Sequence, residues 1–225
     1  MVGPKGDQGP IGLTGLTGAQ GPGGGSGPAG ATGPAGAAGS GGIAITQLSI
    51  CGAGGTSLCK VGVQGPGGGT IFFVDYNDLY AGFNYLEAAP KSCENEIGDL
   101  PALKSWSSAG WVSEDDNWAG RAVGAGRANT VAIKAAFASD TADNNAAHFA
   151  TSCSAGSKSD WFLGSLGEMK LMYDNLQGVG GFVESNYWSS TEVDPNYAWG
   201  QDFSRGLQYN SNKSGTRYVR PVRAF

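Results

Sequence analysis

The chain has 225 residues, 40 of them glycine, and its 14 basic and 19 acidic side chains give a net charge of −5. An acidic balance argues against nucleic acid as a bulk partner. No run of eighteen apolar residues indicates a membrane-spanning helix. No charged and apolar leader precedes Gly3, so we expect the export signal to lie outside this segment.

Glycine occupies every third position from Gly3 to Gly42, fourteen times without a break. Three polyproline-like strands wound together require this period, because no side chain fits at their axis. A flexible glycine-rich linker would carry glycine without a strict period. Residues 1–42 are therefore predicted to form a collagen triple helix, and the chain a homotrimer. Proline occupies only the X positions, so we expect the rod to need a folding nucleus after it.

The segment after the last triplet is apolar and β-branched, with Ile43 and Ile45 alternating as in a strand. Because three copies leave the rod together, residues 43–61 are interpreted as a neck in which three chains pack and set the collagen register. A first strand of the monomer core explains the pattern equally well.

Residues 62–225 suffice for one domain with its own core. A glycine turn opens a buried strand at 70–75, and residues 101–127 are expected to form long structured loops. The capping box Ser165–Glu168 starts a helix with one apolar face: Leu166, Met169, Met172, Tyr173 and Leu176. Further helices are expected at 129–139, capped by Asn129 or Thr130, and at 144–152, and strands at 187–191, 198–203, 206–209 and 217–225. This order predicts an α+β fold.

The four cysteines have none of the close spacings that mark zinc or redox sites. An even number of cysteines beside a collagen-like rod favours two disulfides and an oxidising, extracytoplasmic compartment. Three connectivities are possible, and local loop closure favours Cys51–Cys59 with Cys93–Cys153.

Several stretches resemble one bacterial family: GPGGGTIFFV at 65–74, YLEAAP at 85–90, SDWFLGSLGEMKLMY at 159–173, YWSSTE at 187–192 and RYVRPVRAF at 217–225. They are similar to the DUF1566 domain, which forms the C-terminal domain of the Legionella collagen-like protein and occurs in Fibrobacter surface proteins. Gly164 departs from the family's usual proline before the helix, which should loosen that turn without altering the fold.

The resemblance implies a C-type lectin-like head over residues 62–225 and a trimeric adhesin, extracellular or on the bacterial cell surface. It also implies that the heads bind sulfated polysaccharides, glycosaminoglycans such as heparin among them. A structural tip that nucleates a bacterial or phage collagen-like fibre is the alternative, and a calcium-dependent lectin is another.

The stretch from Arg205 to Phe225 is basic, with five cationic side chains and no acidic one. Guanidinium groups bind sulfate oxygens in two-point fashion, and aromatic rings stack on sugar rings. The candidate glycan-binding residues are accordingly Arg205, Lys213, Arg217, Arg220, Arg223, Trp199, Tyr197 and Tyr209. Structural ion pairs with buried acids such as Glu168 or Asp160 are the competing interpretation, first for Arg220 and Arg223 and also for the other three basic residues. For the aromatic residues, the competing role is core packing.

Oxygen ligands cluster at Asp75/Asn77/Asp78, Glu114/Asp115/Asp116/Asn117 and Asp140/Asp143/Asn144/Asn145, but none fits an EF-hand loop. We expect solvated turns there and no cofactor, with calcium as the alternative. His148 is the single histidine and has no nucleophile spaced to meet it, so we expect no enzymatic activity.

Overall fold

The computed structural model describes residues 47–94, 96–97, 100–101, 103–108, 110, 112 and 118–225. The collagen-like triplets, residues 43–46 and the acidic cluster 114–117 lie outside them, so the predicted triple helix and the Ile43–Ile45 strand pattern stay predictions. The described residues contain both helices and sheets, which is compatible with the predicted α+β class. Among them, no helix has the length and apolar character needed to cross a bilayer.

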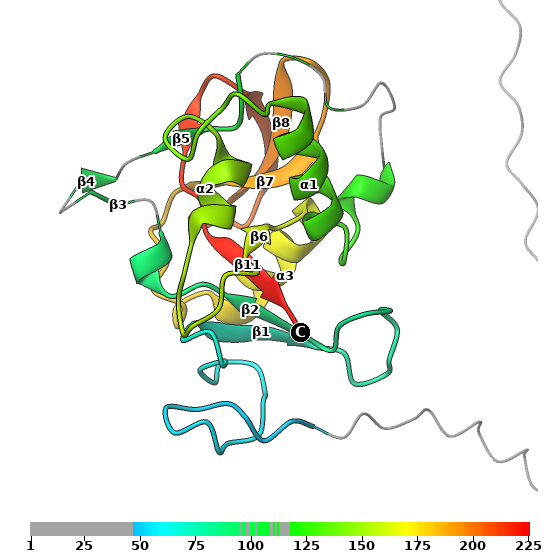
Figure 1. Cartoon of the computed structure of the whole chain (residues 1–225), viewed down its shortest axis with the longest axis vertical. Coiled ribbons are helices and arrows are strands. Elements are labelled where there is room, and N and C mark those ends of the chain that lie inside the picture. The colour runs from blue at the N-terminus through cyan, green and yellow to red at the C-terminus, as the bar shows by residue number, and fades with distance from the viewer. Residues whose placement is uncertain are drawn as a thin grey trace, which may run out of the picture. The chain divides into compact units, whose positions relative to one another are not determined.

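The central sheet has four antiparallel strands in the order β1-β2-β11-β6 (Figure 1). Their bounds are Thr70–Val74 for β1, Tyr85–Ala88 for β2, Pro221–Ala224 for β11 and Phe162–Leu163 for β6. In β11, Val222 lies opposite both Ala88 and Phe162, so the last strand in sequence is an inner strand of the sheet.

A second antiparallel sheet has the order β7-β8-β9, formed by Asn186–Glu192, Tyr197–Asp202 and Gln208–Asn212. Two short ladders accompany it: β10 (Thr216–Arg217) with β5 (Lys104–Ser105), and β3 (Glu96–Ile97) with β4 (Leu100–Pro101). Short 3₁₀ helices are η1 at Lys91–Cys93 and η2 at Trp118–Arg121. The strands predicted at 70–75 and 187–191 are confirmed. The described part of the predicted loop range 101–127 is loop-rich up to residue 125, whereas residues 126 and 127 belong to a helix.

Helix α3 (Leu166–Leu176) begins at the predicted capping box, in which the Ser165 hydroxyl accepts from Glu168 N and the Glu168 carboxylate accepts from Ser165 N. The predicted face is buried at Leu166, Met169, Met172 and Leu176, with Tyr173 at its edge. Helix α2 (Ala146–Ser152) is also confirmed, with the Asn145 side chain as its N-cap.

Helix α1 (Gly126–Ala136) starts earlier than predicted, so the expected caps at Asn129 and Thr130 are wrong. Both side chains instead make tertiary contacts from inside the helix. The Asn129 amide donates to Gly120 O at 2.7 Å, and the Thr130 hydroxyl donates to Leu163 O and accepts from Leu163 N.

Two of the four apolar clusters in the described residues are larger than the others. One packs α3 against the central sheet and β7 through residues such as Phe72, Met169 and Val222. The other packs α1 and α2 around Trp106 and Trp188. Each indole is fully buried, and its N–H donates to a backbone carbonyl, Ser189 O and Lys104 O respectively.

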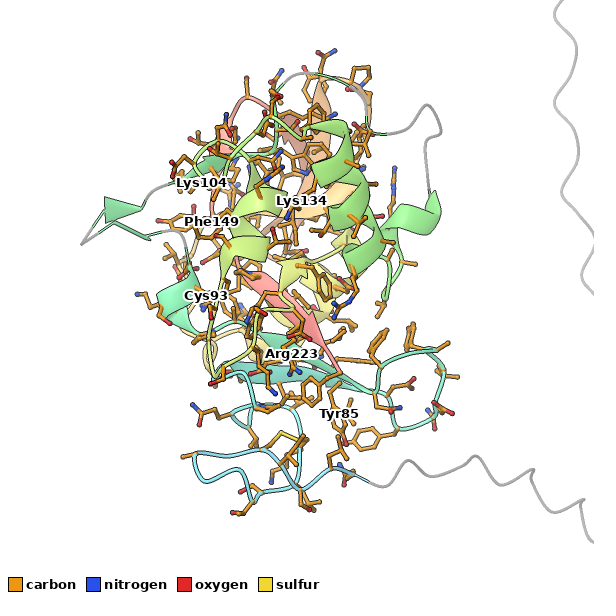
Figure 2. The ribbon with its side chains drawn as sticks, in the orientation of Figure 1. Tyr85, Cys93, Lys104, Lys134, Phe149 and Arg223 are labelled. Carbon is orange, nitrogen blue, oxygen red and sulfur yellow. A yellow bond between two sulfur atoms is a disulfide. The ribbon has the colours of Figure 1, made fainter. Side chains whose placement is uncertain are left out.

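The two disulfides have the predicted connectivity, Cys51–Cys59 and Cys93–Cys153. The first closes an arm over residues 47–64 that continues alongside β1, where Ile71 N donates to Val63 O. Residues 47–50 of this arm are not a strand, so no core strand is formed by the described part of 43–50. The second joins η1, where Figure 2 labels Cys93, to the end of α2. Both cysteines belong to a buried cluster with Trp161.

The disulfides should differ in their contribution to stability because they close loops of different length. In the chain-entropy model, Cys93–Cys153, with a sequence separation of 60, contributes about 4 kcal/mol, and Cys51–Cys59, with a separation of 8, about 2.5 kcal/mol. We expect the C93S/C153S variant to lose more unfolding free energy in urea than the C51S/C59S variant. The reverse order would contradict this account.

Candidate functional site

A buried carboxylate, Glu168, organises the segment that leads into α1. Its side-chain oxygens accept backbone N–H groups from Gly124 at 2.9 Å, Gly126 at 3.4 Å and Ser165 at 2.8 Å. Burial raises the pKa of the Glu168 carboxyl above its usual range, against the lowering effect of these donors. The contact fixes the start of α1 against the start of α3.

Lys213, predicted to contact a ligand, is buried inside the domain. Its ammonium pairs with Glu192, donates to Gly110 O at 2.7 Å and lies 4.6 Å from the centre of the Trp106 ring. Burial lowers the pKa of Lys213, while Glu192 raises it. Lys213 therefore has an internal structural role.

Arg220 and Arg223 are buried as well, in ion pairs of the kind considered as their alternative role. Arg223 Nε donates to Asp160 Oδ1 at 2.6 Å, and its Nη1 lies 3.5 Å from Glu87 (Figure 2). Arg220 lies 3.8 Å from Glu94 and donates to the carbonyls of Ala89, Gly180 and Gly181. Of the two acids named from the sequence, Asp160 is a partner and Glu168 is bonded to backbone instead.

Arg205 and Arg217 remain near the surface but do not converge. Arg205 is exposed in the turn between β8 and β9, where its backbone N–H donates to Asp202. Arg217 is half-buried: it donates to Ser211 Oγ at 2.7 Å and lies 5.7 Å from the centre of the Trp188 ring. The five basic residues therefore do not form one continuous patch.

The aromatic candidates lie on opposite faces of the β8–β9 hairpin. Tyr197 and Trp199 are two residues apart in β8, so their side chains lie on the same face. Tyr209 is paired with Gly200 and therefore lies on the other face. Tyr197 is 41% exposed and Trp199 half-buried. Burial raises the pKa of the Tyr209 hydroxyl, consistent with its inward position beside Arg217.

The face with Tyr197 and Trp199 also carries amides and a guanidinium that the sequence interpretation missed. By register, Asn210 and Asn212 lie opposite Trp199 and Tyr197, and both are exposed. The Arg121 guanidinium lies 4.8 Å from the centre of the Trp199 ring. We call this set of Arg121, Tyr197, Trp199, Asn210 and Asn212 the hairpin face.

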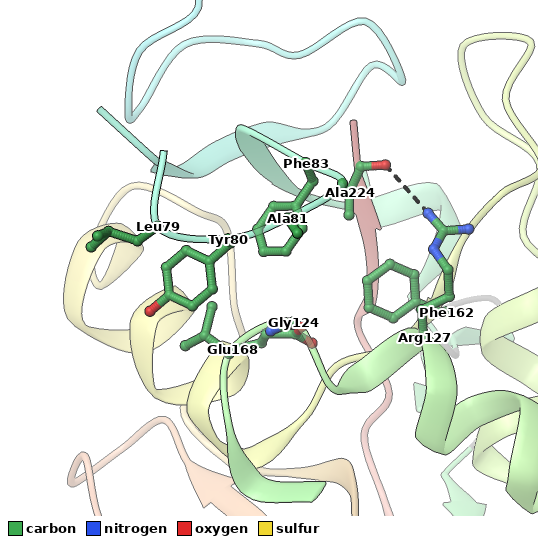
Figure 3. Close-up of a pocket in the computed structure, with 11 residues that line it drawn as sticks. Leu79, Tyr80, Ala81, Phe83, Gly124, Arg127, Phe162, Glu168 and Ala224 are labelled. Carbon is green, nitrogen blue, oxygen red and sulfur yellow. Dashed lines mark hydrogen bonds between the residues drawn. The ribbon is translucent and has the colours of Figure 1, made fainter. Parts of the chain in front are cut away.

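A pocket of about 690 Å³ lies elsewhere on the head, lined by four separate segments of the chain. Figure 3 shows Tyr80 and Phe83 on one side, Phe162 and Arg127 on the other, and Gly124 between them. None of these residues was a candidate from the sequence. The one available signal was the pair of aromatic residues in the glycine-containing turn YAGF at 80–83.

The described oxygen clusters are occupied by internal hydrogen bonds. Asp75 accepts from Asn77 N and Tyr80 N, and Asp140 accepts from Ser108 N and the Asn145 amide. In the described ranges no group of three or more His, Cys, Asp or Glu side chains is placed to hold a metal ion. His148 lies in α2, with Nε2 3.1 Å from Phe137 O.

Comparison with family models found no match, and comparison with curated proteins found no significant match.

The internal role of Lys213 gives a testable consequence. Replacing Lys213 by alanine leaves the Glu192 carboxylate without its ammonium partner in a buried site, which should cost about 3 kcal/mol of unfolding free energy. The exposed Lys170–Asp174 pair is the matched control, and K170A should cost no more than about 0.5 kcal/mol. Urea unfolding of the two variants measures both values. Equal losses would show that the Lys213 pair is energetically like a surface pair.

Proposed function

We propose that the chain is a collagen-stalked, homotrimeric surface adhesin whose C-type lectin-like heads bind sulfated polysaccharides such as heparin. The observation that carries the proposal is the hairpin face, where aromatic rings and amides of β8 and β9 lie together with the Arg121 guanidinium. The two disulfides fit a protein that works in an oxidising, extracellular setting.

The hairpin face has the chemistry that a sugar polymer requires. Aromatic rings offer a surface to pyranose C–H groups, and the amides of Asn210 and Asn212 can donate to and accept from hydroxyl groups. Arg121 beside Trp199 and Arg205 in the adjacent turn supply cationic donors for sulfate oxygens. These two arginines replace the buried Lys213, Arg220 and Arg223 in the binding model.

Trimerisation is supported by an apolar surface on the disulfide-closed arm, which begins a few residues after the last glycine triplet. Leu48 and Ile50 are each 41% exposed and Leu58 51%, whereas the adjacent Cys51 and Cys59 are buried. Three arms that leave one triple helix would bring three such surfaces together and bury them. A trimer also repeats the hairpin face three times, so weak single sites gain avidity on a polymer.

Heparin binding should depend on the hairpin face. Each of R205Q and Y197A should weaken binding of the full-length trimer to immobilised heparin about tenfold, the equivalent of roughly 1.5 kcal/mol per lost contact. K170Q removes the same charge from the outer face of α3 and should leave binding unchanged. Affinity measured at several salt concentrations should fall as salt rises.

Unchanged binding in both variants would contradict this location of the site. A wild-type head that binds no glycan on a sulfated-glycan array would contradict the adhesin and favour the structural tip, in which the head serves to assemble the rod.

The apolar arm should be needed for assembly. The double variant I50D/L58D places charges where three arms would pack, so we expect the trimer to give way to monomers and the triple helix to melt at lower temperature. Multi-angle light scattering and circular dichroism measure these effects. L207D introduces a charge at a comparably exposed leucine outside the arm and should remain trimeric. A trimeric I50D/L58D would place the trimer contact elsewhere.

A further inference from the structure

The pocket around Gly124 has aromatic side chains along one wall. Tyr80 and Phe83 stack on each other with ring centres 5.5 Å apart, and Phe73 and Tyr80 form a T-shaped pair with ring centres 5.6 Å apart. A side chain at position 124 would meet the Phe83 ring at 3.3 Å, and Gly124 has a φ of 92°, so this position keeps the floor of the pocket open.

Arg127 supplies a cation at the opposite wall. Its guanidinium lies 4.9 Å from the centre of the Phe162 ring, and Nη2 donates to Ala224 O at 3.3 Å (Figure 3). The Arg127 side chain is 49% exposed. Its Nε and Nη1 groups have no hydrogen-bond partner in the described part of the head.

The acidic groups near Arg127 leave its charge available to a ligand. Asp160 lies 3.9 Å from Arg127 but 2.6 Å from Arg223, which holds it with the stronger contact. The Glu168 carboxylate at the floor is buried and bonded to three backbone N–H groups. An anion in the pocket therefore meets a guanidinium that can offer two parallel donors.

We propose that this pocket binds a ring-shaped ligand that carries one carboxylate group. The ring packs against Tyr80 and Phe83, and the carboxylate pairs with Arg127. A volume of about 690 Å³ is within the range of small-molecule sites and holds a substituted ring. Two sources share this chemistry, a uronic acid unit of a polysaccharide and a free aromatic acid. The site is separate from the hairpin face and stands whether or not that face binds heparin.

The test is a titration of the full chain with three probes: methyl glucuronide, benzoate and the neutral methyl glucoside. Saturation-transfer NMR measures the binding of each probe. We expect one of the two acids to bind and the glucoside to bind at least about tenfold more weakly. Binding of methyl glucuronide would identify the ligand as a uronic acid unit, and binding of benzoate would identify it as an aromatic acid. Equal binding of acid and glucoside, or no binding of any probe, would overturn the proposal.

Two variants locate the binding. A81W fills the pocket from an exposed position on its rim without removing an internal contact, and it should abolish acid binding. R127Q removes the cation and should weaken acid binding about tenfold. K170Q, which removes a cation from the outer face of α3 and away from both proposed sites, is the control and should leave acid binding unchanged. If A81W binds the acid as well as the wild type does, the ligand does not bind in this pocket. A thermal melting curve of each variant checks that it is folded.

Discussion

The Glu168 carboxylate is the contact on which both proposed binding surfaces depend. By accepting N–H groups from Gly124, Gly126 and Ser165, it joins the first turn of α1 to the first turn of α3. A side chain at Gly126 would meet the Glu168 oxygen at 2.2 Å, so the two elements touch without space between them. The segment fixed in this way includes Arg121, whose guanidinium contacts the Trp199 ring, and Arg127, whose guanidinium contacts the Phe162 ring.

Local signals in the sequence were sufficient where a few neighbouring residues decide the structure. The Ser165–Glu168 capping box, the helix predicted at 144–152 and the strand predicted at 70–75 depend on residues adjacent in sequence, and all three are confirmed. Loop closure also decided the disulfide pairing. The start of α1 could not be found in this way, because Thr130 bonds to Leu163, which is 33 residues away.

The candidate sites were harder to predict because charge alone does not show what lies opposite it. The residues near Lys213 in the sequence do not indicate that it pairs with Glu192. Arg223 likewise pairs with Asp160, which is 63 residues away in the sequence. The aromatic candidates Tyr197 and Trp199 were identified by residue type, but Arg121 lies in the short 3₁₀ helix η2, which no periodic pattern in the sequence indicates. The pocket joins residues from positions 79 to 224, a combination that only the folded chain brings together.

The position of β11 constrains the order in which the molecule can be made. A nascent chain that has reached Arg220 has β1, β2 and β6 but lacks the strand that pairs with both β2 and β6. The head therefore completes its sheet late, after the collagen-like residues have been synthesised, since long-range strand pairing must await both partners. If the glycine triplets form the proposed rod and the head sets its register, winding would begin at the carboxyl end of the triplets and truncated chains would be excluded from assembly.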